Sequence, residues 1–200
     1  MLKLVGSHTS PFVRKTRIVT GELGLWDRVE LVIAEGTALD ADPGLRGAHP
    51  LKKVPFLELE DGALVYDSRT VCEALCQMVP GQTLLPEAGP ARIETLTRQA
   101  LVDGLCDAAV GAAYETRLRP PEKVWDDWIE AQLGKTARAL DAIEATPPPA
   151  GRFDLGDCAL AGALPYLELR YPDRPWREGR PKLAAWWETA KNRPAVAETL

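Results

Sequence analysis

The sequence has no long apolar run, and none of its stretches approaches the ~20 residues that a membrane-spanning helix needs. Basic residues are too few for a broad positive surface, because 24 Lys and Arg stand against 29 Asp and Glu, a formal net charge of −5. This balance disfavours nucleic-acid binding, which requires neutralised phosphates. A secretory signal peptide is not expected either, since Ser7 and His8 interrupt the short apolar start. We therefore expect a cytoplasmic protein with no membrane and no nucleic-acid partner.

Metal-binding and redox motifs are also missing. The two histidines, His8 and His49, lie far from any pair of cysteines, and the four cysteines include no Cys-x-x-Cys motif. These absences disfavour a zinc site and a dithiol redox centre. All four cysteines stand in apolar, helix-like contexts, which is typical of buried free thiols. We expect no metal cofactor.

The overall composition is that of a globular protein, and the sequence divides into two halves with different patterns. It is 46% hydrophobic and 26% charged over 200 residues, which excludes disordered and fibrous classes. Apolar periodicity predicts strands at residues 2–5, 26–33, 54–59 and 63–66, and helices at 11–23 and from 68 onward. Residues 34–50 have a weak pattern, for which we expect at most one helical turn. No strand-like alternation follows Tyr66, and a segment rich in proline and glycine from residue 79 separates the helical remainder.

The first candidate site is the junction between the first strand and the first helix. Ser10 stands where an N-cap belongs, and Pro11 takes the first helical position, where a missing N–H costs nothing. The amides of Phe12 and Val13 should then be unpaired at the positive end of the helix dipole, a place that suits an anion. The alternative is a helix cap that does no chemistry. Thr9 and Ser7 offer hydroxyls close to that of Ser10, but Ser10 alone precedes the helical proline.

Two further segments carry candidate binding groups. Lys53-Val54-Pro55 opens a strand at a place that suits a cis proline, which would turn the Val54 backbone outward to pair with an extended peptide. The alternative is an ordinary edge-strand proline. Asp67 and Ser68 begin a second helix, where they could hold an ammonium and a carboxylate group, or merely cap that helix.

Several cations flank these segments. Arg14, Lys15 and Arg17 follow the first cap, and we interpret them mainly as a solvated helix face that has a minor role in steering anions. Lys52 and Lys53 are better partners for a ligand carboxylate, because they precede the strand that would line the site.

The order and spacing of these motifs resemble the cytosolic glutathione S-transferases over nearly the whole chain. Ser10-Pro11-Phe12-Val13 resembles the Cys-Pro-Tyr-Cys of glutaredoxins with both cysteines lost, and residues 49–57 resemble the Asn-Pro-x-Gly-x-Val-Pro-x-Leu stretch of the family. Asp67-Ser68 resembles its Glu/Asp-Ser pair, and residues 153–157 its capping motif before a buried helix. His49 and Lys52 depart from the Asn and Gly of the family, so we expect the loop before Val54 to differ.

This resemblance implies the fold and the domains. It implies a thioredoxin-like glutathione-binding domain with the order β-α-β-α-β-β-α at residues 1–78, a linker at 79–88 and an all-helical domain at 89–200. A homodimer is expected.

The resemblance also implies residue roles. Ser10 would hydrogen-bond the glutathione sulfur, with Phe12 beside it. Lys53 would contact the glycine carboxylate, and Val54, followed by the cis Pro55, would pair with the cysteinyl backbone. Asp67 and Ser68 would hold the γ-glutamyl end.

The function implied is transfer of glutathione, as a detoxifying enzyme would, to a small electrophilic substrate. Glutathione is then a co-substrate whose thiolate attacks the electrophile. Two alternatives stay open: a glutathione-binding or scaffold protein without turnover, and a glutathione-dependent dehalogenase, isomerase or lyase.

Overall fold

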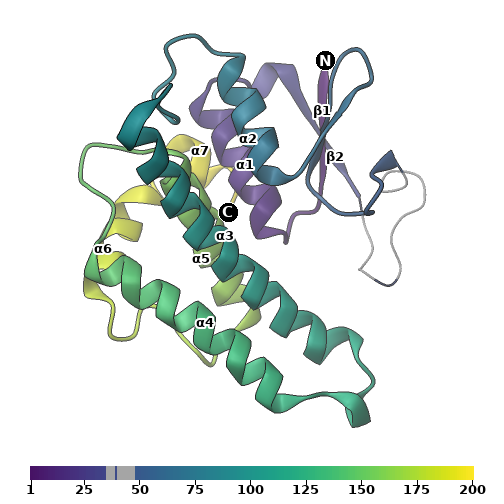
Figure 1. The fold of residues 1–200 in the computed structure, drawn as a ribbon, viewed down its shortest axis with the longest axis vertical. Coiled ribbons are helices and arrows are strands. Elements are labelled where there is room, and N and C mark those ends of the chain that lie inside the picture. The colour runs from purple at the N-terminus through teal and green to yellow at the C-terminus, as the bar shows by residue number, and fades with distance from the viewer. Residues whose placement is uncertain (35–38, 40–47) are drawn as a thin grey trace.

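The structure, a computed structural model, describes residues 1–34, 39 and 48–200. Its N-terminal part contains a four-stranded sheet with the strand order β2-β1-β3-β4. The strands are β1 (Leu2–Gly6), β2 (Val29–Ile33), β3 (Phe56–Glu58) and β4 (Leu64–Val65). Strand β1 pairs parallel with β2 and antiparallel with β3, and β3 pairs antiparallel with β4. Figure 1 shows this sheet beside helices α1 (Pro11–Glu22) and α2 (Ser68–Gln77).

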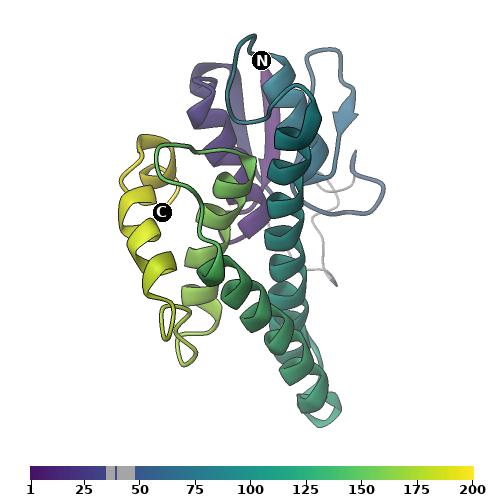
Figure 2. The ribbon, with the colours of Figure 1, turned by 60° about the vertical axis from the view of Figure 1, so that its left-hand side comes forward.

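The remainder of the chain is helical. Its main helices are α3 (Gly89–Leu118), α4 (Asp126–Ala145), α5 (Leu155–Arg170), α6 (Pro181–Ala190) and α7 (Pro194–Ala197). Figure 2 shows α3 running down much of the length of the molecule, with α4 returning beside its far end. Within the described residues no strand follows β4, so the predicted fold class is confirmed.

The strands are shorter than the sequence pattern predicts. Trp26–Arg28 forms a 3-10 helix (η1), so the predicted strand at 26–33 begins only at Val29, which pairs with Leu2 of β1. Strand β3 begins at Phe56 because Pro55 has no N–H to give to a ladder. The helical turn expected within residues 34–50 lies mostly outside the described residues.

Helix α5 forms the centre of the core. Its residues from Leu155 to Leu164 are all buried, as expected of a helix that is apolar on every side, and it packs against both α1 and α3. The predicted capping motif is confirmed: Asp154 Oδ1 accepts from Gly156 N at 2.9 Å, and Asp157 Oδ2 accepts from Asp154 N at 2.8 Å. The start of α5 is thereby satisfied without water, although it is buried.

The cysteines are buried and free, as predicted. Burial raises the pKa of Cys72 and of Cys76 to about 12. Their thiols therefore stay protonated and unreactive at neutral pH.

Candidate functional site

Ser10 is the N-cap of α1, as predicted. Its backbone is extended (φ −77°, ψ 125°), Pro11 occupies the first turn, and the Ser10 Oγ accepts from Val13 N at 3.3 Å. The expectation that the Val13 amide is unpaired was wrong, because this amide donates to the Ser10 side chain. The Phe12 N–H, in contrast, has no acceptor among the described residues. A hydroxyl that accepts one bond still has its own proton to donate, so Ser10 can bind an anion at the helix tip.

Two glycines hold the first turn of α1 in place. A Cβ on Gly162 of α5 would lie 3.0 Å from both Lys15 N and Pro11 O, which is tighter than ordinary contact. On the sheet side, a Cβ on Gly6 would come within 2.5 Å of Val13 Cγ1. The turn that carries Ser10 is therefore packed directly on the sheet and on α5, and its position is fixed by the core.

The Val54–Pro55 peptide bond is cis, as predicted for this motif. Pro55 is buried, Val54 is half-buried and Lys53 is exposed. Lys52, which replaces the glycine of the family motif, has φ of +50°, the left-handed region that glycine adopts without cost. The loop thus retains a glycine-like backbone at a position where the side chain is lysine.

His49 fills the place of the family's asparagine. Its Nδ1 accepts from Leu51 N at 2.9 Å, which is the kind of local turn bond that an asparagine oxygen makes. The ring is packed against Phe56 and Tyr66, with centroid separations of 5.7 Å and 4.2 Å. Burial, and to a smaller degree the charge of Lys53, lowers the pKa of His49. The imidazole is therefore neutral at pH 7, with Nδ1 free to accept.

Asp67 is the N-cap of α2. Its Oδ1 accepts from Arg69 N at 3.0 Å, so Asp67 caps its own helix, which was one of the two alternatives. Its side chain is nevertheless exposed, while Ser68 at the first helical position is buried. The second carboxylate oxygen of Asp67 remains available to a cationic group.

The sheet register brings the three motifs to one edge. Val5 pairs with Phe56, and Leu57 pairs with Val65. Continuing both ladders by one or two residues places position 55 between position 6 on one side and position 67 on the other. The Ser10 loop, the Val54–Pro55 bond and the start of α2 therefore meet at the same end of the sheet. This grouping is what a single extended ligand would need.

A buried ionic cluster beneath this edge was missed by the sequence analysis. Lys15 Nζ lies 2.7 Å from Asp103 Oδ1, and Arg69 Nε donates to Asp103 Oδ2 at 2.9 Å. Lys15 and Asp103 are only 1% and 2% exposed. The prediction that Lys15 lies on a solvated helix face was wrong. The Lys15 ammonium also lies 6.0 Å from the centroid of the half-buried Phe12 ring.

One signal in the sequence points to this cluster. Asp103 occupies the same helix face as Gln99 and Cys106, and all three are buried. A carboxylate on an apolar face requires a buried cation as partner, but sequence spacing alone does not identify that cation. One turn further along α3, burial and then the charge of Asp103 raise the pKa of Asp107, while Arg69 and Lys53 partly oppose this shift.

Comparison with known proteins identifies the family. The family model described as glutathione S-transferase, N-terminal domain, matches residues 9–78, and that of the C-terminal domain matches residues 126–188. The uncharacterized GST-like protein YibF of Escherichia coli strain K12 is 31% identical over 202 residues, which cover 99% of this chain and 98% of YibF. The chain belongs to the glutathione S-transferase family.

Solved structures of glutathione S-transferases match the whole fold. A glutathione transferase family member from Pseudomonas fluorescens Pf-5, crystallised with bound glutathione, has a TM-score of 0.96 and 39% identity. A glutathione S-transferase from Methylobacillus flagellatus KT, also with glutathione bound, has a TM-score of 0.90 and 35% identity. Each match covers 100% of this chain and 98% of the other.

The described residues contain neither a candidate membrane span nor a candidate metal cluster. Over residues 1–34, 39 and 48–200, no helix is both long enough and apolar enough to traverse a bilayer. In the same part of the chain, no three His, Cys, Asp or Glu side chains gather in an arrangement that could hold a metal ion.

Proposed function

We propose that this protein binds glutathione at the sheet edge formed by the Ser10 loop, Val54–Pro55 and the start of α2, and transfers it to a small electrophilic substrate. Family membership supports the reaction class. The two full-length structural matches that were crystallised with glutathione support the co-substrate. The observation that carries the proposal is the Ser10 cap, because its hydroxyl proton and the Phe12 amide lie together at a helix N-terminus.

The Ser10 hydroxyl and the N-terminus of α1 activate the thiol of glutathione. A free thiol has a pKa near ~8.5, so only a few per cent of it is thiolate at neutral pH. A hydrogen bond from Ser10 and the positive end of α1 both stabilise the charged sulfur and lower that pKa. Ser10 acts as a donor to the sulfur and is not itself the nucleophile, since no described histidine contacts it as a base.

The remaining contacts follow from the placement of each group. The Val54 backbone, next to the cis Pro55, pairs with the cysteinyl unit of glutathione, and exposed Lys53 binds the glycine carboxylate. The free oxygen of Asp67 binds the γ-glutamyl ammonium, and Ser68 binds its carboxylate. Phe12 lies beside the sulfur.

We further propose that the protein is a cytoplasmic homodimer. Each chain would consist of a domain at residues 1–78, a linker at 79–88 and a second domain at 89–200. Large apolar side chains remain exposed in this chain: Leu51 in the loop before β3, and Ile93 and Leu101 on α3. A second subunit that covers these side chains would remove their apolar surface from water. Light scattering after size-exclusion chromatography tests the dimer.

The decisive experiment compares three hydroxyl variants. Ser10→Ala should raise the apparent pKa of the bound thiol, followed by thiolate ultraviolet absorbance, and lower turnover by about 10- to 100-fold. Thr9→Ala and Ser7→Ala, the matched controls, should leave both unchanged. If Thr9→Ala or Ser7→Ala has the larger effect, Ser10 is not the sulfur donor.

Retention on a glutathione column without turnover of a broad electrophile panel would instead indicate a binding protein. Release of halide, or isomerisation of a substrate, would indicate one of the other glutathione-dependent reactions.

A further inference from the structure

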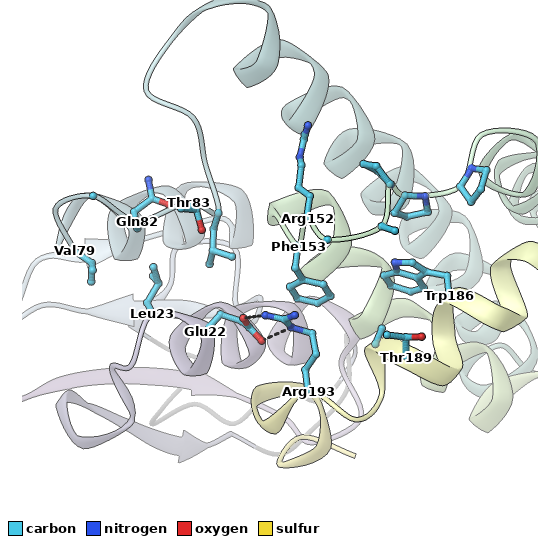
Figure 3. A pocket seen from close by; sticks show the side chains of 18 of the residues that line it. Glu22, Leu23, Val79, Gln82, Thr83, Arg152, Phe153, Trp186, Thr189 and Arg193 are labelled. Atoms are coloured by element: carbon cyan, nitrogen blue, oxygen red, sulfur yellow. Dashed lines mark hydrogen bonds and ion pairs between the residues drawn. The ribbon is translucent and has the colours of Figure 1, made fainter.

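Helix α5 continues past the N-terminal tip of α1. A Cβ on Gly162 of α5 would lie 3.0 Å from Pro11 O, in the first turn of α1. At the other end of α1, Glu22 accepts from Arg193 Nε at 2.8 Å, and the Arg193 guanidinium lies 4.1 Å from the centroid of Phe153, which stands just before α5. Figure 3 shows these three side chains together. Helix α5 is therefore antiparallel to α1, and its residues after Gly162 lie beyond the tip of α1.

Helix α3 continues past the same tip. In its first half, Arg98 pairs with Asp154, the N-cap of α5, and further along the helix Asp103 pairs with Lys15 of α1. These two contacts make α3 parallel to α5, so its residues after Asp103 also lie beyond the tip of α1. The second half of α3 and the last turns of α5 thus form two walls in front of the helix tip at which we place the sulfur of glutathione.

Arg170 reaches back toward this tip from the last turn of α5. It follows Gly162 by about two turns, or roughly 12 Å along the helix. Side chains of a helix lean toward its N-terminus, and the Arg170 guanidinium accordingly lies 5.8 Å from the centroid of Tyr166, one turn closer to α1. Burial and then the neighbouring phenols, that of Tyr114 on α3 included, raise the pKa of Tyr166, while the charge of Arg170 opposes this rise. The guanidinium therefore lies between the two walls.

Arg170 makes no ion pair with any residue that the structure describes. The nearby acid on α5, Glu168, is already occupied, because it accepts from Trp176 Nε1 at 2.9 Å and pairs with Arg177. The Nε–H of Arg170 is shielded from water and has no acceptor among the same residues. A guanidinium that is partly withdrawn from water without an anion is in an unfavourable environment, which an anionic ligand would improve.

The surface around Arg170 is accessible to a small molecule. Tyr114 on α3 is 39% exposed, and Leu169, on the same face of α5 as Gly162, is 53% exposed. The half-buried Phe12 ring lies at the tip of α1 between them and the proposed sulfur position. These side chains offer apolar contact to the body of a ligand, while Arg170 offers a fixed positive charge to its anionic group.

We propose that Arg170 binds a carboxylate on the electrophile, so that the acceptor of glutathione is a small organic acid. This inference rests on the proposed transfer reaction, because it names the acceptor class for the same site. The thiolate sulfur forms a bond to the electrophilic carbon, and a leaving group such as chloride departs with the electron pair of the bond that breaks. The thiol proton passes to water. Arg170 exchanges no bond in this step, and its charge orients the acid so that the electrophilic carbon faces the sulfur.

The test compares two electrophiles of nearly the same shape, 4-chloro-3,5-dinitrobenzoate and 4-chloro-3,5-dinitrobenzamide. After division by the uncatalysed rate constants, kcat/KM of the wild-type protein should favour the benzoate by at least about tenfold. Arg170→Gln should lower kcat/KM for the benzoate by about 10- to 100-fold more than for the benzamide, and Arg170→Lys should recover part of this loss. Arg28→Gln, at an exposed arginine in η1, is the matched control and should change neither.

Equilibrium binding separates this inference from the transfer reaction itself. Calorimetry with the two S-aryl glutathione products, one with the carboxylate and one with the amide, needs no turnover. The wild-type protein should bind the carboxylate product about tenfold more tightly, and Arg170→Gln should bind both products equally. That result without turnover of either electrophile would support the Arg170 contact and refute the transferase function.

Three outcomes would overturn the Arg170 contact. Turnover or binding with no preference of the wild-type protein for the carboxylate overturns it and leaves the transferase function standing, and this comparison holds even if the Arg170 variants prove unstable. An equal loss of affinity for glutathione alone in Arg170→Gln would assign the arginine to the tripeptide instead. No binding of glutathione or of either product would overturn both proposals.

Discussion

Lys15 Nζ lies 2.7 Å from Asp103 Oδ1 in a part of the protein from which water is almost wholly excluded. The second oxygen of Asp103 accepts from Arg69, so one carboxylate on α3 joins the N-terminal half of α1 to the first turn of α2. The N-caps of these two helices are Ser10 and Asp67. The cluster therefore holds the two halves of the proposed glutathione site at a fixed separation.

Replacing Asp103 by asparagine should be strongly destabilising. The substitution leaves the Lys15 ammonium buried without a counter-charge, which typically costs about 3–5 kcal/mol. Urea unfolding measures this loss. The double variant Lys15→Met/Asp103→Leu removes both charges and should recover most of the stability. If Asp103→Asn alone costs less than about 1 kcal/mol, the pair is not buried in solution as it is here.

His49 should make the loop before β3 sensitive to acid. Its pKa is lowered from 6.5 in the folded protein, so the unfolded chain takes up a proton first as the pH falls. Stability is intact above pH 6.5 and declines below it, by at most about 1.4 kcal/mol per pH unit, until the folded-state pKa is reached.

Unfolding free energies measured from pH ~7.5 to ~5.5 test this slope. In His49→Asn an amide oxygen can accept from Leu51 N without titrating, so this component of the slope should vanish. His8→Gln, at an exposed histidine, serves as the control. An unchanged slope in His49→Asn would contradict the assignment.

Gly162 should not tolerate a methyl group. Alanine there would place its Cβ 3.0 Å from two backbone atoms of α1, so the helices must separate, at a cost of about 1–3 kcal/mol. Gly104 in α3 is a matched control, because its Cβ would meet no heavy atom within 4 Å. Gly104→Ala should instead stabilise the protein by about 0.5–1 kcal/mol. Thermal melts of both variants decide the matter, and equal shifts would count against the close packing.

At position 52, we expect glycine to be tolerated and a β-branched residue to destabilise the protein. At φ of +50° glycine avoids the cost of about 1 kcal/mol that other residues incur, although its greater freedom in the unfolded chain offsets part of the gain. Lys52→Gly should therefore change stability by less than about 1 kcal/mol. Lys52→Val should cost about 1–2 kcal/mol more than Lys52→Gly. Denaturant midpoints of the two variants provide the comparison, and a more stable valine variant would refute the backbone assignment.

The helix caps could be predicted from the sequence because they depend on neighbouring residues. Strand ends and buried ion pairs could not, because they depend on tertiary packing. Ser10 before Pro11 and the Asp154 motif form the expected helix starts, because each cap is made by residues within three positions of one another. Strand ends depended on pairing, and β3 is limited to three residues. Lys15 was misassigned because its partner is 88 residues away, a separation that no local pattern reports.

The position of Asp103 also limits how this protein can be recombined. An isolated fragment of residues 1–78 would contain the Lys15 ammonium but not its carboxylate, which belongs to the helical half. Such a fragment should be a poor stand-alone module. Chimeras that graft this N-terminal half onto the helical half of a relative should fold well only when the recipient supplies an acid at the position of Asp103.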